Sequence, residues 1–183
     1  MINVAKMKKM VKETYLLWGV EGDYMLVTDG YRAYKDKIDS FDPKMKAALF
    51  AEFGRVPEKG ETWKRTRPSK LDKYGKVKIE KTSSTVSGIL GRPEYLEKPV
   101  FYTGMTFEGW DILRVEEGLA VFNSDFFHSL KNPEEATIHG NGKAVSMARF
   151  TFDNETMEYY LLPISTKNLE ARVKEKLGFN VEK

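Results

Sequence analysis

Closely spaced cationic side chains that could bind phosphates are concentrated in residues 55–81, which we name the basic segment. These residues hold ten Lys and Arg against four Asp and Glu, a local balance of +6. The other residues carry 20 basic and 23 acidic side chains, a balance of −3, so the net charge of +3 averages two unlike parts. Nucleic-acid backbones attract such a cluster because binding releases their condensed counterions.

Two aromatic residues, Trp63 and Tyr74, stand inside the basic segment, where their rings could stack on unpaired bases. Alternate side chains of an extended strand face the same side, so the cations could follow a phosphate chain. We therefore predict that the segment binds nucleic acid or an acidic protein surface. The alternative is a solvated ribbon whose lysines protect a sheet edge from aggregation. The candidate binding residues are Trp63, Lys64, Arg65, Arg67, Lys70, Lys73, Tyr74, Lys76 and Lys78.

Metal and catalytic chemistry has less support in the sequence. The histidines, His128 and His139, stand in no His-x-x-His or Glu-x-x-His spacing, and a metal site that joined them to Asp125 would need a further ligand. Asp29 and Asp125 follow two similar hairpins and are the pair that could hold Mg²⁺ in an enzyme. Both also suit hairpin ends or helix caps. We predict no catalytic residue, no metal and no cofactor, and a metal-dependent enzyme is the alternative.

Length and composition favour a folded protein. With 183 residues the chain is long enough for one domain or for two small halves. Hydrophobic residues at 41% and charged residues at 31% argue against a disordered or fibrous chain. No apolar run approaches the roughly 20 residues that cross a bilayer, and no signal peptide is evident. Because cysteine is absent as well, we expect a cytoplasmic protein without a membrane segment.

Turn and cap signals predict the elements of the first half. Turn residues between two apolar runs predict a hairpin over residues 15–28. An Asp-Pro pair before residues 43–53 and Gly54 after them predict a helix there. The basic segment is predicted as a polar hairpin or exposed ribbon with strands in ETWKRTR and KVKIEK, followed by a loop or edge strand over 81–88.

The second half is predicted to contain a hairpin, a loop and two long strands, at residues 110–122, 131–142, 144–152 and 156–164. Further helices are predicted over residues 2–14, 124–131 (capped by Ser124) and 165–177. The fold class is therefore α+β, a mostly antiparallel sheet with three or four helices. The chain is expected to form a single domain, whose halves, 1–90 and 91–183, could be an internal duplication.

One family resemblance rests on two short stretches. VTDGYRAYK (residues 27–35) resembles the strand and turn of sliding-clamp domains, and YYLLPI (159–164) is similar to their closing strand. Clamps are also built from duplicated hairpin-and-helix halves, so the resemblance implies that architecture. The chain is much shorter than a complete bacterial clamp, and its basic residues cluster in one segment. No functional residue is carried over from the family.

The leading hypothesis is a small intracellular, non-enzymatic binding protein that engages nucleic acid, or a nucleic-acid-handling protein, through the basic segment. A phage or mobile-element accessory protein, including an inhibitor of a host nuclease, would have this appearance. One alternative is a metal-dependent enzyme acting on nucleotides or nucleic acid. Another is a structural or oligomerising protein that pairs exposed aromatic residues of YYLLPI or VFYTG across a two-fold axis.

Overall fold

The computed structural model describes residues 2–68, 75–90, 96–143, 147–153, 156–163 and 175. Its first half passes from two short helices through three strands to a longer helix and a second hairpin. The elements are α1 (Val4–Met7), η1 (Met10–Lys12), β1 (Tyr15–Glu21), β2 (Tyr24–Thr28), β3 (Arg32–Lys37), α2 (Pro43–Phe53), β4 (Thr62–Thr66), β5 (Lys78–Thr82) and α3 (Val86–Leu90).

Local signals account well for α2 and for the hairpin β1–β2, and both predictions are confirmed. The carboxylate of Asp42 accepts hydrogen bonds from the backbone N–H groups of Lys44 and Met45, which caps the start of α2. Gly54 ends the helix in the left-handed conformation, with φ at 70°. The strands predicted in ETWKRTR and KVKIEK are also confirmed, as β4 and β5.

Two first-half predictions need correction. The helix expected over residues 2–14 is divided into α1 and η1. After α1 the chain changes to the 3₁₀ pattern, because the backbone N–H groups of Lys9, Val11, Lys12 and Glu13 donate to carbonyls three residues earlier. At the end of η1, Arg65 donates hydrogen bonds to the carbonyls of Val11 and Glu13, so these carbonyls are not engaged by a continuing helix. The loop or edge strand expected over 81–88 is also wrong in part, since the helix α3 begins at Val86.

In its described residues, the second half contains six strands and the short helix α4. Its elements are β6 (Lys98–Phe107), β7 (Trp110–Val115), β8 (Gly118–Asn123), α4 (Ser124–Phe127), η3 (Pro133–Glu135), β9 (Thr137–Gly140), β10 (Ala148–Thr151) and β11 (Glu158–Leu161). The hairpin predicted over 110–122 is confirmed as β7–β8. The loop predicted over 131–142 is wrong, because it contains η3 and β9.

The remaining second-half predictions are corrected in detail. Asn123 caps α4, not Ser124, because its side-chain oxygen accepts the N–H of Asp125. The two long strands exist as β10 and β11 but are shorter than expected. The helix predicted over 165–177 lies outside the described residues, apart from Glu175.

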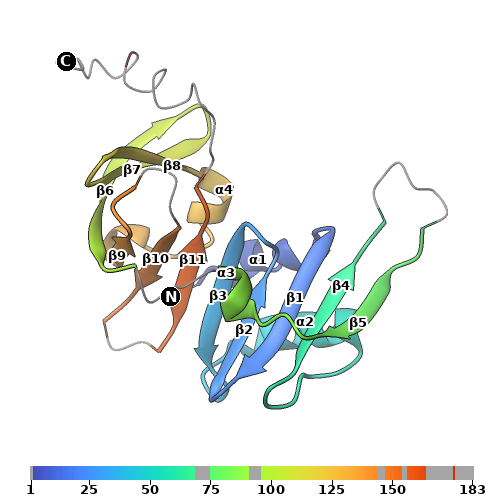
Figure 1. The fold of residues 1–183 in the computed structure, drawn as a ribbon. Coiled ribbons are helices and arrows are strands. Elements are labelled where there is room, and N and C mark those ends of the chain that lie inside the picture. The colour runs from blue at the N-terminus through green and yellow to red at the C-terminus, as the bar shows by residue number, and fades with distance from the viewer. Residues whose placement is uncertain are drawn as a thin grey trace.

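All the described strands belong to one sheet. Its order is β5-β4-β1-β2-β3-β11-β10-β9-β6-β7-β8, and every neighbouring pair is antiparallel. The two halves meet where β3 pairs with β11, and the hairpin β4–β5 projects from the first half, away from the second (Figure 1). The predicted α+β class with a mostly antiparallel sheet is confirmed. The internal duplication stays a prediction.

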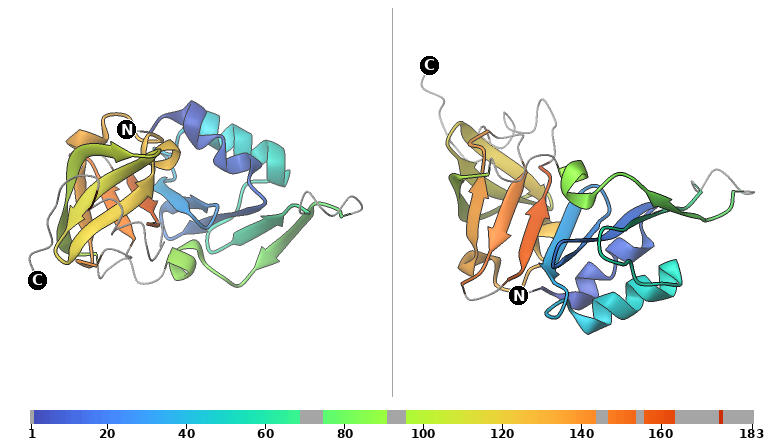
Figure 2. Two further views of the ribbon diagram at one scale, coloured as in Figure 1. Left: turned by 90° about the horizontal axis from the view of Figure 1, so that it is seen from above. Right: turned by 60° about the horizontal axis from the view of Figure 1, so that its bottom comes forward.

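One hydrophobic core extends across both halves. Its buried side chains include Trp18 and Phe53 from the first half and Phe127, Phe150 and Tyr159 from the second. The helices α1 and α2 lie side by side over one face of the first-half strands, as both views of Figure 2 show.

Candidate nucleic-acid interface

The core-facing side of the hairpin β4–β5 holds Trp63, Arg65 and Arg67, because alternate residues of β4 share a face. The side chain of Arg65 is 0% exposed. Its Nη2 donates to the carbonyl oxygens of Val11, at 2.9 Å, and Glu13, at 2.8 Å. Burial lowers the pKa of this guanidinium. Arg65 therefore links the end of η1 to β4 through these hydrogen bonds, and its charge is not exposed at the surface.

The neighbours of Arg65 are also engaged within the protein. Arg67 forms an ion pair with Glu52 of α2. The Trp63 ring is half-buried, with the guanidinium carbon of Arg55 4.3 Å from its centre. The indole N–H of Trp63 donates to Glu61, which also pairs with Lys81 at 2.7 Å. Lys81 is the main cause that holds the pKa of the Glu61 carboxyl at about 2.

On the opposite face of the hairpin, one carboxylate binds two predicted site residues. Glu80 lies directly across from Lys64 in the register, and its oxygens are 3.2 Å from Lys64 Nζ and 2.6 Å from Lys78 Nζ. Both lysines, Lys78 first, lower the pKa of Glu80. Lys76 is exposed and has no ion pair with any described residue. The predicted residues Lys70, Lys73 and Tyr74 lie outside the described ranges.

A second basic surface, which we name the helix layer, is formed by residues 4–13 and 43–55, that is α1, η1, α2 and their ends. It carries seven basic and two acidic residues, a balance of +5. Elements α1, η1 and α2 contact one another, so their charges share one surface. None of the six lysines in the helix layer forms an ion pair with a described residue; they are Lys6, Lys8, Lys9, Lys12, Lys44 and Lys46.

The density of Lys and Arg along the sequence predicted a binding surface on the hairpin. The same criterion did not identify the helix layer. A usable signal exists in the alternation of Lys with Met over residues 6–12 and 44–46. Met7, Met10 and Met45 are fully buried, which turns the adjacent lysines toward solvent. Apolar residues at helical spacing therefore locate the outward-facing cations.

The carboxylates and histidines considered for metal chemistry are separated in the structure. Asp29 is buried, with its Oδ2 3.0 Å from Arg32 Nε, whereas Asp125 is exposed at the start of α4. His128 lies 3.6 Å from the buried Asp111, whose other oxygen accepts the Tyr102 hydroxyl, while His139 is on β9. In the described ranges no group of three or more such side chains could hold a metal ion.

Asp29 has an evident structural role at the junction of the two halves. Its partner Arg32 donates from Nη1 to Ser129 Oγ at 3.1 Å and lies 4.4 Å from the centre of the Phe126 ring. Asp29 also accepts the backbone N–H groups of Tyr31 and Arg32. The TDGYR stretch is therefore a hydrogen-bonded turn that links β3 to the region of α4.

A shallow apolar crevice lies at the same junction, beside α3. Three exposed hydrophobic residues stand around it: Tyr31 at 63% exposure, Ile89 at 41% and Leu162 at 40%. The lining residues are Thr28, Gly30, Tyr31, Arg32, Ile89, Leu90, Met147, Tyr160 and Leu162. Exposed apolar side chains that gather at one crevice are typical of interaction sites.

Comparisons with known proteins give limited information. No protein-family model matches the sequence, and no curated protein matches it. Among solved structures, the DNA polymerase III beta subunit of Thermotoga maritima is similar with a TM-score of 0.40 and 12% identity, over 90% of this chain and 65% of that one. The beta chain from Streptococcus pneumoniae gives 0.41 and 12%, over 91% and 64%.

The chain thus spans slightly less than two thirds of each of these two structures. The resemblance of residues 27–35 and 159–164 to sliding-clamp domains stays a prediction from the sequence. A likeness at these values carries no conclusion about activity or partners. Among the residues described, no helix is long and apolar enough to cross a membrane.

Proposed function

We propose that the protein is a non-enzymatic binding protein whose helix layer contacts the phosphate backbone of nucleic acid. One observation carries this proposal: six lysines of the helix layer lack ion pairs with described residues, whereas most described cations of the hairpin are paired. Cations without protein partners keep their full attraction for phosphates, while paired cations must first give up a carboxylate. In the basic segment, only exposed cations without an ion pair, such as Lys76, would then contribute to phosphate binding.

The type of cation indicates the mode of binding. Lysine is a flexible point charge that contacts phosphates, and base recognition relies more on the bidentate geometry of arginine, asparagine and glutamine. All cations of α1, η1 and α2 are lysines. The affinity of the helix layer for nucleic acid should therefore depend strongly on the salt concentration and weakly on the nucleotide sequence.

The first experiment measures the affinity for a fluorescent DNA duplex between about 50 and 200 mM salt. If all six lysines contact phosphates, the log–log slope of affinity against salt is about −5. The triple reversal Lys8→Glu, Lys9→Glu and Lys12→Glu should reduce the slope to about −3 or weaker and lower the affinity at low salt. Circular dichroism and thermal unfolding verify that the variant is folded.

The matched control reverses three hairpin lysines: Lys64→Glu, Lys76→Glu and Lys78→Glu. It changes the net charge by the same amount, so a general loss of positive charge would weaken binding equally in both variants. A larger loss with the hairpin variant would contradict the proposal and favour the basic segment. No binding to duplex or single-stranded DNA or RNA at low salt would exclude a nucleic-acid ligand and leave an acidic protein as the partner.

The finer hypotheses stay predictions from the sequence: a phage or mobile-element accessory protein, an inhibitor of a host nuclease, and a cytoplasmic location. A Mg²⁺-dependent activity would appear as cleavage of labelled DNA or RNA during the same binding assays. An oligomerising protein would show a concentration-dependent mass in sedimentation. These measurements need no variant and separate the alternatives directly.

We infer a second candidate function, docking of a short apolar peptide from a partner protein, from the crevice beside α3. Tyr31, Ile89 and Leu162 expose apolar surface that a peptide side chain would cover. Selection from a random peptide library should yield apolar peptides that bind the wild type and lose binding to Leu162→Asp. The control Phe50→Asp changes a residue of similar exposure on α2. If the selected peptides lost their binding equally to both variants, or kept it with both, docking at the crevice would be contradicted.

A further inference from the structure

A hollow in the second half lies where β6 changes its partner strand. Residues 98–100 of β6 pair with β9, whereas the pairing with β7 includes Phe101 across from Arg114. Toward Val100, the pairing between β6 and β7 ends at Phe101 and Arg114. The hollow has a volume of about 410 Å³ and is lined by Lys98, Pro99, Phe101, Arg114, Val115 and Glu116.

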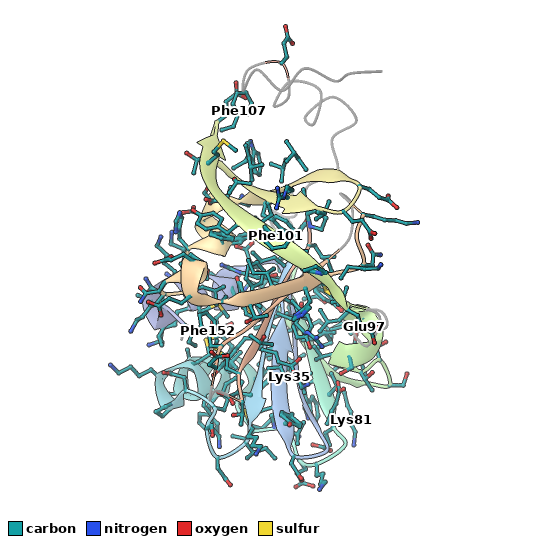
Figure 3. All side chains as sticks on the ribbon, turned by 90° about the vertical axis from the view of Figure 1, so that its left-hand side faces the viewer. Lys35, Lys81, Glu97, Phe101, Phe107 and Phe152 are labelled. Atoms are coloured by element: carbon teal, nitrogen blue, oxygen red, sulfur yellow. The ribbon has the colours of Figure 1, made fainter. Side chains whose placement is uncertain are left out.

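An exposed aromatic ring forms one wall of this hollow. Phe101 is 51% exposed and lies about midway along β6, between the labelled Glu97 and Phe107 (Figure 3). Its neighbours on either side, Val100 and Tyr102, belong to the core or pack against it, so alternation turns Phe101 to the outer face. An exposed large apolar side chain beside a hollow offers a surface for a ligand.

A guanidinium stands over this ring. The central carbon of Arg114 is 4.9 Å from the centre of the Phe101 ring, as expected for directly opposed residues on neighbouring strands. Arg114 is exposed and forms no ion pair with a described residue. Its N–H groups are therefore available to an anion, and its planar group offers a second flat surface, above the ring, on which a base can stack.

The second cation of the hollow is only weakly held. Lys98 Nζ lies 3.5 Å from Glu116 Oε2, and both side chains are more than half exposed. A surface ion pair of this kind contributes little, so Lys98 can exchange its carboxylate for a phosphate. With Lys98, Arg114 and Glu116, the lining has a net charge of +1.

We propose that this hollow binds an unpaired nucleotide of a single-stranded nucleic acid. The base stacks against the Phe101–Arg114 pair, and the adjoining phosphate accepts hydrogen bonds from Arg114 and Lys98. Stacking on an aromatic ring or a guanidinium plane needs a base whose face is free, which a duplex does not offer. An acidic peptide would supply the negative charge but would leave the flat surface unused.

This site goes beyond the proposed function because it lies on β6 and β7, in the other half from the helix layer, and selects unpaired strands. The test measures the affinity for a fluorescent oligothymidine and for a duplex of equal length. Phe101→Leu, which keeps an apolar side chain and removes the ring, should weaken oligothymidine binding about 5- to 150-fold. Duplex binding should stay the same.

Three further variants sharpen the test. Tyr31→Leu removes an exposed ring (63%) that lies outside the helix layer and the hollow, and it should leave the preference for oligothymidine unchanged. Phe101→Trp keeps a stacking surface and should retain the affinity, with its added fluorescence quenched by oligothymidine. Arg114→Gln should weaken oligothymidine binding and reduce its dependence on salt.

Four outcomes would overturn the inference. They are unchanged oligothymidine affinity in Phe101→Leu, an equal loss for the duplex, no quenching in Phe101→Trp, and displacement of oligothymidine by polyglutamate at an equal concentration of charge. The two proposals fail separately. If reversal of the helix-layer lysines leaves duplex binding unchanged while Phe101→Leu abolishes the preference for oligothymidine, the helix layer is excluded and the hollow stands.

Discussion

The hairpin β4–β5 and the helix layer are both rich in cations, yet they present their charge in opposite ways. In the hairpin, Glu80 binds Lys64 and Lys78, and Glu61 binds Lys81. In the helix layer, no lysine has an ion pair with a described residue. The density of cations along a sequence therefore does not measure the charge that is available to a ligand. The charge available to a ligand depends on where the carboxylates lie relative to the cations.

The difference arises from the geometry of the two elements. Directly opposed residues on neighbouring strands have Cβ atoms about 4.5–5.5 Å apart, so the side chain of Glu80 on β5 reaches that of Lys64 on β4. On a helix the neighbours of a side chain are three and four residues away. For Lys44 of α2 these are Ala47 and Ala48, which offer no carboxylate. The hairpin thus neutralises its cations by cross-strand pairing, while the helix leaves them free.

The largest expected effect concerns the buried cation of the hairpin. Arg65→Ala should destabilise the fold by about 2–4 kcal/mol, because two backbone carbonyls, that of Val11 buried, lose a charged donor and packing is lost as well. The measurement is urea unfolding followed by circular dichroism. Arg67→Ala is the control: its side chain is 34% exposed, and the expected change is below about 1 kcal/mol. Equal effects of the two variants would show that Arg65 does not have the structural role inferred here.

The sequence predicted those parts of the fold that depend on neighbouring residues. The cap at Asp42 and the turn at Gly54 are local signals, and α2 was found correctly. The end of η1 is bound by Arg65, 54 residues from Val11, so no local pattern could reveal that contact. The short strand β9 was missed for a similar reason, because it is defined by its pairing with β6 and β10, which are distant in the sequence.

The candidate site was predicted only in part, for a related reason. The basic character of the hairpin was evident, but its neutralisation depends on the register that places Glu80 across from Lys64 and on the packing of Glu52 against Arg67. Neither can be read from the order of residues alone. The helix layer was recoverable in principle, because buried methionines at helical spacing predict outward lysines.

A smaller effect is expected from releasing cations in the hairpin. Glu80→Gln removes the carboxylate that binds Lys64 and Lys78, so both lysines become available to phosphates. Duplex affinity at about 50 mM salt should rise about two- to fivefold, with a slope that is steeper by up to about 2. Glu58→Gln is the control, because it removes an equal charge from an exposed glutamate that pairs with no lysine among the described residues. If both variants gain equally, net charge matters and pairing does not.

The smallest expected effect is a local response to pH at Glu61. The partners of this carboxylate are Lys81, the backbone N–H of Glu58 and the indole N–H of Trp63, and together they lower its pKa to about 2. In an unfolded chain a glutamate titrates near about 4.3. Since the folded pKa is the lower one, the contribution to stability is present above about 4.3 and is lost as the pH falls toward 2.

The indole N–H resonance of Trp63 follows this titration directly, because it donates to Glu61 at 3.3 Å. It should stay constant from neutral pH to about 4 and move only below that, where Glu61 protonates. Trp18 is an internal control: its indole nitrogen is buried without a hydrogen-bond partner, so its resonance should move only on unfolding. A midpoint for Trp63 near 4.3 would mean that Lys81 does not hold Glu61 in solution. The contrast between a paired hairpin and an unpaired helix layer would then weaken at the ion pair between Lys81 and Glu61.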